Sequence, residues 1–160
     1  MKVWIGSDHG GFELKQKLKK AFEEKGCEIT DVGGYSEEIV RYPYFAGKVA
    51  QAVAEGAADR GILICSTGIG MSVIANKYKG IRAALCLTPH MAEMTRRHNN
   101  SNVLCLGGKI TGHAEALDMA EIWLTTEYEG GRHDISLGLI AEAEEAQLTG
   151  GFWVPELPMK

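Results

Sequence analysis

The sequence predicts an α/β protein with a doubly wound, Rossmann-like fold, in which a five-stranded parallel sheet lies between two layers of helices. Two observations predict it. Five short strand-like segments alternate with segments in which apolar residues recur at helical spacing. The segment 60–65 (RGILIC) is also continuously apolar after its first two residues, as a strand buried on both faces should be. Such sheets bind ligands beyond the carboxyl ends of their strands.

The first half of the chain shows this alternation clearly. The apolar segment 2–6 predicts a strand, which stops at a run of polar residues and glycines. Helical spacing over 12–25, followed by a glycine as C-cap, predicts the first helix, and 27–32 predicts the second strand. A second helix is expected over 43–54, because a proline suits the first turn of a helix. The third strand is 60–65.

The second half continues the alternation and ends in a helix. Its expected elements are a helix at 71–77, a strand at 80–87, a helix at 91–97, a strand at 102–106, and helices from 112 or 113 to about 123 and from about 135 to 148. The segment 149–160 contains two prolines and an apolar Phe-Trp-Val run. We expect one domain over 1–148 and a tail over 149–160 at a subunit interface.

Composition limits the function classes. Of the 160 residues, 45% are apolar, enough for one hydrophobic core, and 17 basic against 21 acidic residues give a net charge of −4. This balance argues against nucleic-acid binding. No apolar stretch approaches the roughly 18 residues of a membrane span, and no secretory signal is visible at the start of the chain. The expected compartment is therefore the cytoplasm.

The four cysteines, Cys27, Cys65, Cys86 and Cys105, are far apart in the sequence, and none belongs to a C-x-x-C pair or a zinc-ligand cluster. Neither a disulfide framework nor a metal or other cofactor is expected. In a reducing compartment, each cysteine is either a small buried hydrophobic residue or a reactive thiol. The neighbouring residues must decide which one is reactive.

The stretch 65–72 (CSTGIGMS) is the most informative, because it places a thiol at a strand end, ahead of a glycine-bearing loop that leads into a helix. The backbone N–H groups of such a loop bind an anion or oxyanion, and the same positive field favours a thiolate at Cys65. A buried cysteine beside a tight turn is the structural alternative. A phosphatase loop is excluded because Met71 stands where C-x5-R needs arginine, and the Gly-Lys-Ser/Thr of a Walker loop is absent.

Other polar residues have both a functional and a structural interpretation. Asp8 and His9 precede two glycines at the end of the first strand, where they could bind a ligand, although Asp8 alone could cap the first helix. His98 could act on a ligand or complement the end of its helix. Three basic residues that follow glycine pairs could bind an anion or lie in solvated turns: Lys109, Arg132 and His133.

Together, one thiol, one or two imidazoles, an anion-binding loop and scattered cations suit proton transfer on a phosphorylated small molecule. A base that removes a proton next to a carbonyl needs an oxyanion site for the resulting enediolate. This chemistry requires no metal.

Six motifs follow one another over residues 1 to about 147: SDHGG at 7–11, Tyr42-Pro43, GILICSTGIGMS at 61–72, ANKYKGIRAALC at 75–86, RRHNNSNVL at 96–104 and EGGRH at 129–133. Together they resemble the ribose-5-phosphate isomerase B family, which also contains the galactose-6-phosphate isomerase subunits. The resemblance implies an aldose–ketose isomerase of the pentose phosphate pathway that acts through an enediolate without a metal. It also implies a homodimer, or a homotetramer built as a dimer of dimers, with active sites between subunits.

The resemblance implies a role for each matching residue. Cys65 matches the base that moves a proton between C1 and C2. His98 matches the acid, supplied by the neighbouring subunit, that opens the furanose ring. Thr67 matches a hydroxyl that assists proton transfer at the oxygens. The loop that holds the enediolate is matched by Ser66, Gly68, Ile69 and Gly70. The remaining matches are substrate contacts: Asp8, His9, Tyr42, Lys109, Asn99 of the partner chain, and the phosphate ligand Arg132.

One departure from the family pattern affects phosphate binding. Many relatives have a second arginine four residues after the one matched by Arg132, and this chain has Ser136 there. Losing such a contact typically costs about 1.5 to 3 kcal/mol, unless His133 or Arg41, which stands where an acidic residue is common, compensates. The alternatives are an isomerase of allose 6-phosphate, galactose 6-phosphate or erythrulose 4-phosphate, or a sugar-phosphate-binding protein without turnover.

The presence of Cys65 and His98 in one chain selects among these alternatives. The family resemblance implies that the galactose-6-phosphate subunits lack the ring-opening histidine and divide their site between two different chains. A chain with both residues favours a self-sufficient homo-oligomer that interconverts ribose 5-phosphate and ribulose 5-phosphate.

Overall fold

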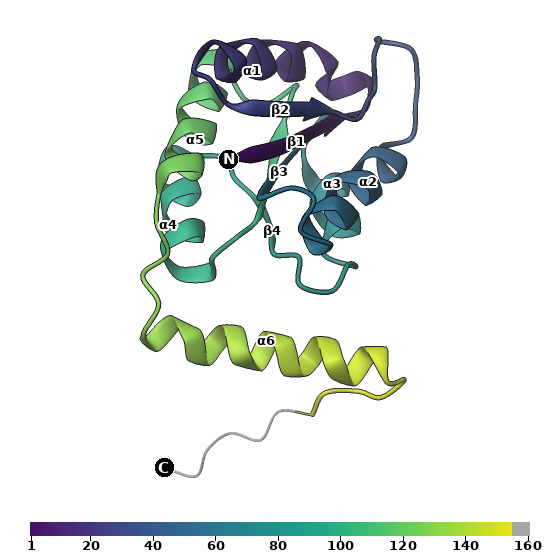
Figure 1. Ribbon diagram of the computed structural model, residues 1–160. Coiled ribbons are helices and arrows are strands. Elements are labelled where there is room, and N and C mark those ends of the chain that lie inside the picture. The colour runs from purple at the N-terminus through teal and green to yellow at the C-terminus, as the bar shows by residue number, and fades with distance from the viewer. Residues whose placement is uncertain (155–160) are drawn as a thin grey trace. The chain divides into compact units, whose positions relative to one another are not determined.

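The computed structural model describes residues 1–154 and confirms the doubly wound α/β fold (Figure 1). All strand pairs are parallel, in the order β2-β1-β3-β5-β4. The strands are β1 (Lys2–Ser7), β2 (Glu28–Asp31), β3 (Arg60–Cys65), β4 (Ala83–Leu85) and β5 (Val103–Gly107). The helices are α1 (Phe12–Glu24), α2 (Tyr42–Ala54), α3 (Ile69–Ala75), α4 (Pro89–Asn99), α5 (His113–Thr125) and α6 (Arg132–Leu148), with a short 3₁₀ helix at His9–Gly11. No helix within residues 1–154 is long and apolar enough to cross a membrane.

The chain divides into two compact units. The first, Met1–Tyr128, holds the sheet and α1 to α5, and the second, from Glu129 onward, holds α6. The single domain expected over 1–148 stays a prediction. Residues 155–160 of the expected tail lie outside the described residues.

Two apolar cores lie on opposite faces of the sheet, because successive side chains of a strand point to opposite faces. In β3, Ile62 and Ile64 pack with apolar side chains of α1, α4 and α5, whereas Leu63 and Cys65 pack with those of α2 and α3. Figure 1 shows these two helix layers on either side of the strands. The alternation therefore places the Cys65 side chain on the α2 and α3 side of the sheet.

Three elements differ from their predicted bounds. Helix α3 begins at Ile69, two residues early, because Gly68 with φ of 79° forms its left-handed N-cap. Strand β4 covers only Ala83–Leu85, because the Asn102 side chain accepts a hydrogen bond from the Arg82 N–H before the regular ladder starts. Helix α6 begins at Arg132 rather than near 135, so Arg132 and His133 lie in its first turn.

Candidate active site

Cys65 lies at the carboxyl end of β3 with only 6% of its surface exposed. Its Sγ accepts a hydrogen bond from the Gly68 N–H at 3.1 Å. A donor in this position stabilises a sulfur that carries negative charge. The predicted arrangement of a thiol beneath a glycine-bearing loop is therefore present.

Burial keeps two other cysteines in the neutral thiol form. It raises the pKa of Cys86 to about 12 and, with the nearby Cys65 and Cys86 thiols, holds the pKa of Cys105 well above its ordinary value. Both side chains remain neutral thiols near neutral pH. They are the small buried hydrophobic residues that the sequence allowed as an alternative, and all four cysteines are free of disulfides.

The loop after Cys65 is shaped by glycine. At Gly68, an added Cβ would lie 2.6 Å from Leu85 Cδ1 and 2.9 Å from the Leu106 carbonyl carbon, and the positive φ is already unfavourable for other residues. At Gly70, an added Cβ would lie 2.7 Å from the Tyr42 ring, which packs against the loop. At these two positions there is room for backbone but not for a side chain.

Thr67 and its neighbours complete this loop. The Thr67 hydroxyl accepts a long hydrogen bond of 3.4 Å from the Ile69 N–H. Ser66 and Thr67 are half-buried, and Ile69 is exposed. Of the five predicted loop residues, 66 to 68 therefore form the turn after Cys65, and Ile69 and Gly70 begin α3.

Asp8 caps the 3₁₀ helix that follows β1, and not α1 as its structural alternative predicted, because the N-cap of α1 is Gly11. Its Oδ1 accepts hydrogen bonds from the N–H groups of Gly10 at 2.9 Å and Gly11 at 3.2 Å. The turn lies against the Cys65 loop, because an added Cβ at Gly10 would lie 2.2 Å from Ser66 Oγ. The structure therefore brings the Asp8 turn and the Cys65 loop together.

His9 is half-buried and faces the loop that precedes α2. Its Nδ1 lies 3.3 Å from the Val40 carbonyl oxygen and 3.4 Å from the Val40 nitrogen. Arg41, the N-cap residue of α2, and Tyr42 follow directly in the chain, and both are exposed. The contact of His9 with Val40 therefore links His9 to the chain two residues before Tyr42.

A third segment reaches the same place from the end of β5. The Gly108 N–H donates to the Cys65 carbonyl oxygen at 2.8 Å, and the Lys109 N–H donates to the Ser66 carbonyl oxygen at 3.0 Å. An added Cβ at Gly108 would lie 2.6 Å from the Gly10 carbonyl oxygen. Lys109 is exposed beside the loop, as its predicted role as a substrate contact requires.

Lys15 is a supporting residue that the sequence reasoning overlooked. Its buried ammonium donates to Asp31 Oδ1 at 2.6 Å and to the carbonyl oxygens of Gly33 at 3.0 Å and Gly34 at 2.8 Å. Burial lowers the pKa of Lys15, and the Asp31 carboxylate opposes this shift. The position of Lys15 in the sequence, next to Leu14 on the buried face of α1, was the signal that could have indicated its burial.

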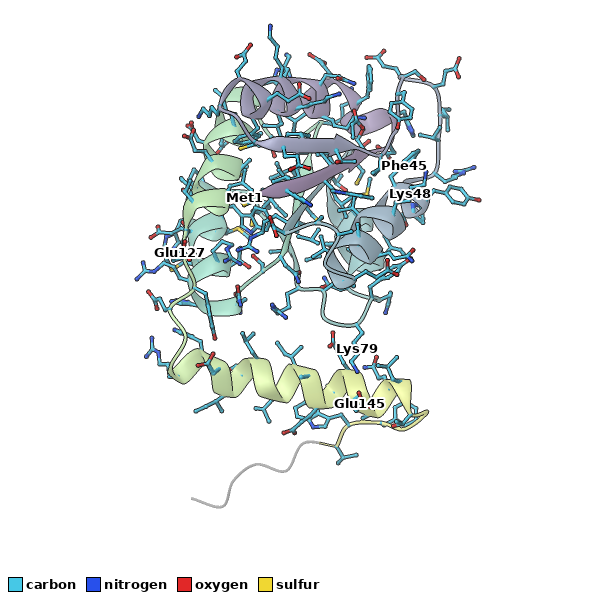
Figure 2. The ribbon with its side chains drawn as sticks, in the orientation of Figure 1. Met1, Phe45, Lys48, Lys79, Glu127 and Glu145 are labelled. Atoms are coloured by element: carbon cyan, nitrogen blue, oxygen red, sulfur yellow. The ribbon has the colours of Figure 1, made fainter. Side chains whose placement is uncertain are left out.

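The segment at Gly33 and Gly34, which Lys15 holds, borders the site on the side of β2. Gly33 and Gly34 exchange backbone hydrogen bonds with Ser7, directly before Asp8. An added Cβ at Gly33 would lie 2.5 Å from the ring of Phe45, which Figure 2 labels near the start of α2. Lys15 thereby fixes the backbone next to Asp8 and His9.

His98 and Asn99 are not brought to this site within one chain. They end α4, which runs back from β4 to the amino end of the sheet, where Arg82 Nε donates to the Asn99 carbonyl oxygen at 3.0 Å. Cys65 pairs with Gly107 at the opposite end of β3, four residues beyond the Gly61–Val103 pair, or about 13 Å of strand rise. His98 lies in the last turn of its helix, as its structural alternative predicted.

The remaining predicted residues lie on α6 in the second unit. Arg132 and Ser136 are both exposed and share one helix face, since they are four residues apart. His133 Nε2 lies 3.4 Å from Glu129 Oε2. A cation at position 136 would therefore lie on the same helix face as Arg132.

Comparisons with known proteins agree with this fold. Residues 3–140 match the family model described as Ribose/Galactose Isomerase. Ribose-5-phosphate isomerase B of Escherichia coli is 44% identical over 144 residues, 90% of this chain and 97% of the relative. The structure of ribose-5-phosphate isomerase B from Clostridium thermocellum matches with a TM-score of 0.90 at 48% identity, covering 91% of this chain and 98% of that one.

A further relative bears on substrate size. The 4-deoxy-4-sulfo-D-erythrose isomerase of Clostridium sp. strain MSTE9 is 43% identical over 130 residues, 80% of this chain and 81% of the relative. Overall identity therefore does not separate it from the Escherichia coli protein. The chain belongs to the ribose/galactose isomerase family, and the prediction that it is an isomerase is confirmed.

Proposed function

We propose that the protein interconverts ribose 5-phosphate and ribulose 5-phosphate through an enediolate. The observation that carries this proposal is the Cys65 thiol at the end of β3, with the Gly68 N–H directed at its sulfur at 3.1 Å. The relatives named ribose-5-phosphate isomerase B, which match nearly the whole chain, support the choice of substrate.

The reaction is a proton transfer between neighbouring carbons. The Cys65 thiolate removes the proton from C2 of the open-chain aldose, the electron pair of that C–H bond forms the C1–C2 double bond, and the carbonyl electrons move to O1. The thiol then returns the proton to C1, while the Thr67 hydroxyl relays the O2 proton to O1. Backbone N–H groups of residues 66–70 stabilise the negative charge of the enediolate. We expect this electrostatic stabilisation to be the main contribution of the loop to the rate of the reaction.

The other site residues bind the substrate in this proposal. Asp8, His9 and Tyr42 surround the Cys65 loop and contact sugar hydroxyls, and Lys109 lies at its open side. Arg132 of α6 binds the phosphate. His133 and Arg41 compensate for the contact that is missing at Ser136.

We propose a cytoplasmic homodimer, or a tetramer of two dimers, in which each site takes His98 and Asn99 from the neighbouring chain. Support comes from the fold, because these two residues end α4 at the amino end of the sheet, whereas Cys65 lies at its carboxyl end. The exposed side chains Phe152 and Val154 support a role for the tail in the subunit interface.

A second candidate is an isomerase of a shorter or longer sugar phosphate. Ser136 favours it, because the missing cation alters the position at which a phosphate binds. The relative named 4-deoxy-4-sulfo-D-erythrose isomerase favours a four-carbon substrate with an anionic end group.

Steady-state isomerisation of four-, five- and six-carbon aldose phosphates, without added metal, tests both candidates. We expect the highest kcat/KM with ribose 5-phosphate. A clear preference for erythrose 4-phosphate or allose 6-phosphate would replace the pentose assignment with the second candidate. Binding of these phosphates without turnover of any of them would leave only a sugar-phosphate-binding protein.

A further inference from the structure

Arg96 is a buried arginine that the proposed mechanism does not use. It lies on α4, two residues before His98, and only 2% of its surface is exposed. Its Nη1 donates to the Ser101 carbonyl oxygen at 2.5 Å and to Asn100 Oδ1 at 2.9 Å, and its Nε donates to the Thr126 carbonyl oxygen at 3.3 Å. The guanidinium thus connects the end of α4 to the end of α5.

These contacts converge on the turn that carries His98 and Asn99. Asn100 is the C-cap of α4 and has φ of 45°, a left-handed backbone conformation that residues other than glycine adopt infrequently. Arg82 holds the same turn from the β4 side, because its Nε donates to the carbonyl oxygens of Asn99 at 3.0 Å and Asn100 at 3.1 Å. Trp123 Nε1 donates to Ser101 Oγ at 2.8 Å.

Burying this guanidinium is costly. All three hydrogen-bond acceptors named above for Arg96 are neutral oxygens. Burial, together with the charge of Arg60, lowers the pKa of Arg96 to about 10. A buried charge that binds neutral groups is a poor way to gain stability, since an apolar side chain of similar size fills a core at lower cost. Its value lies in fixing the geometry of the groups that it binds.

We propose that Arg96 is a positioning residue, which fixes the turn at residues 99–101 so that His98 and Asn99 are presented in one orientation to the site of a neighbouring chain. The proposal rests on the proposed function for the role of His98. Arg96 acts through hydrogen bonds to Asn100 and Ser101 and does not touch the substrate.

The test uses the full-length protein and two variants that weaken these hydrogen bonds differently. Arg96→Lys keeps the charge, but one ammonium nitrogen cannot take the places of both Nε and Nη1. Asn100→Gly keeps Arg96 and the left-handed backbone but removes one acceptor, so it remains informative where the buried lysine prevents folding. Arg97→Lys is the matched control, because Arg97 is the next residue of α4, has 40% of its side chain exposed and pairs with Glu93 at 3.1 Å. His98→Ala is the reference for loss of ring opening.

The first readout is amide hydrogen exchange, which does not depend on the substrate. In the wild type, the N–H groups of Asn100 and Ser101 donate to the carbonyl oxygens of Arg96 and Thr95. In both Arg96→Lys and Asn100→Gly, we expect faster exchange confined to residues 99–102. Unchanged exchange in both variants would overturn the proposal. Faster exchange throughout the sheet would also overturn it, because Arg96 would then be a general stabilising residue.

The second readout compares two aldose phosphates. Ribose 5-phosphate is a closed furanose in solution, whereas erythrose 4-phosphate carries phosphate on the oxygen that would close its ring. We expect Arg96→Lys to lower kcat/KM for ribose 5-phosphate by about tenfold to a hundredfold, with a much smaller loss for erythrose 4-phosphate, as in His98→Ala. Equal losses on both aldoses would overturn the positioning role. A wild-type protein inactive on both sugars would instead refute the proposed function, and hydrogen exchange would still decide whether Arg96 holds the turn.

Discussion

The two ends of the sheet are built by different means. At the carboxyl end, three turns meet around Cys65 through backbone hydrogen bonds, and added Cβ atoms at Gly10, Gly68 and Gly108 would lie within 3 Å of neighbouring atoms. At the amino end, long side chains hold the backbone, with Arg82 and Arg96 donating to carbonyl oxygens of one turn.

This difference reflects what each end must do. A pocket needs space and backbone N–H groups that face it, so it is built from glycines that bring loops close together. Within residues 1–154, the turn at residues 99–101 has no strand beside it, and guanidiniums with several donors, that of Arg96 buried and that of Arg82 half-buried, hold it. We therefore expect substitutions at the carboxyl end to affect catalysis most, and matched substitutions at the amino end to affect stability or ring opening.

The largest effect is expected for Cys65→Ala. Loss of the base should lower kcat for ribose 5-phosphate on the order of 10³-fold or more, while the thermal unfolding curve stays close to that of the wild type. Cys86→Ala is the matched control, because Cys86 is also a buried thiol at a strand end but remains neutral. Comparable activity in the two variants would remove Cys65 from the mechanism.

Gly68→Ala should have the next largest effect. The new methyl group would collide with Leu85 and the Leu106 backbone and displace the N–H that donates to Cys65, so we expect kcat to fall about 100-fold. Gly80→Ala is the control for strain alone, because Gly80 has φ of 76° with no neighbouring atom within 4 Å of an added Cβ. It should cost about 1 to 2 kcal/mol of stability and leave kcat unchanged. If both variants lose kcat equally, the position of the loop does not control catalysis.

At the amino end, Trp123→Phe should reduce stability rather than catalysis. It removes the donor to the buried Ser101 hydroxyl and part of a fully buried ring, so the free energy of unfolding should fall by about 2 kcal/mol. The Arg82 and Arg96 hydrogen bonds remain, and kcat measured well below the unfolding temperature should stay close to wild type. Denaturant unfolding and initial rates on the same samples check this, and a selective loss of kcat would contradict the comparison.

The smallest effect concerns alkaline stability. The Cys86 thiol has a pKa of about 12 in the folded protein against an ordinary value of 9.0, so the unfolded chain loses this proton first as pH rises. Its contribution to stability is full below about pH 9 and decreases towards pH 12, by about 1.4 kcal/mol per pH unit. Cys86→Ala should therefore show a shallower loss of unfolding free energy between about pH 8 and about pH 10. Parallel curves would show that the buried thiol does not contribute.

Most of the fold could be predicted because β3 and β5 are buried on both faces and read as unbroken apolar runs, and because glycines closely follow the ends of α1, α2 and α6. Strand β3 was predicted with its observed bounds, 60–65. Strand β4 was predicted too long, since apolar residues at 80–87 also serve turns and core packing outside the ladder. The hydrophobicity of these residues does not show whether they lie in a strand, in a turn or in the core outside the sheet.

The site was predictable as far as local sequence encodes it. The Cys65 loop and the Asp8 turn are short motifs at strand ends, and the fold brings strand ends together. Lys15 and Arg96 were missed because their importance depends on burial and on carbonyl acceptors distant in the chain, such as Gly33 and Thr126. Charged residues within amphipathic helices are usually solvated, so sequence alone gives little reason to single out two of them.

The separation of His98 from Cys65 along the sheet also determines how defects combine. In the proposed dimer, each site takes one of these residues from each chain, so a mixed dimer of Cys65→Ala and His98→Ala chains has one doubly defective site and one intact site. Two proteins that are each defective on ribose 5-phosphate should then complement each other once their subunits exchange. Dilution that dissociates the dimer should silence even the wild type. Only the dimer would be active, so the specific activity of the enzyme would depend on protein concentration.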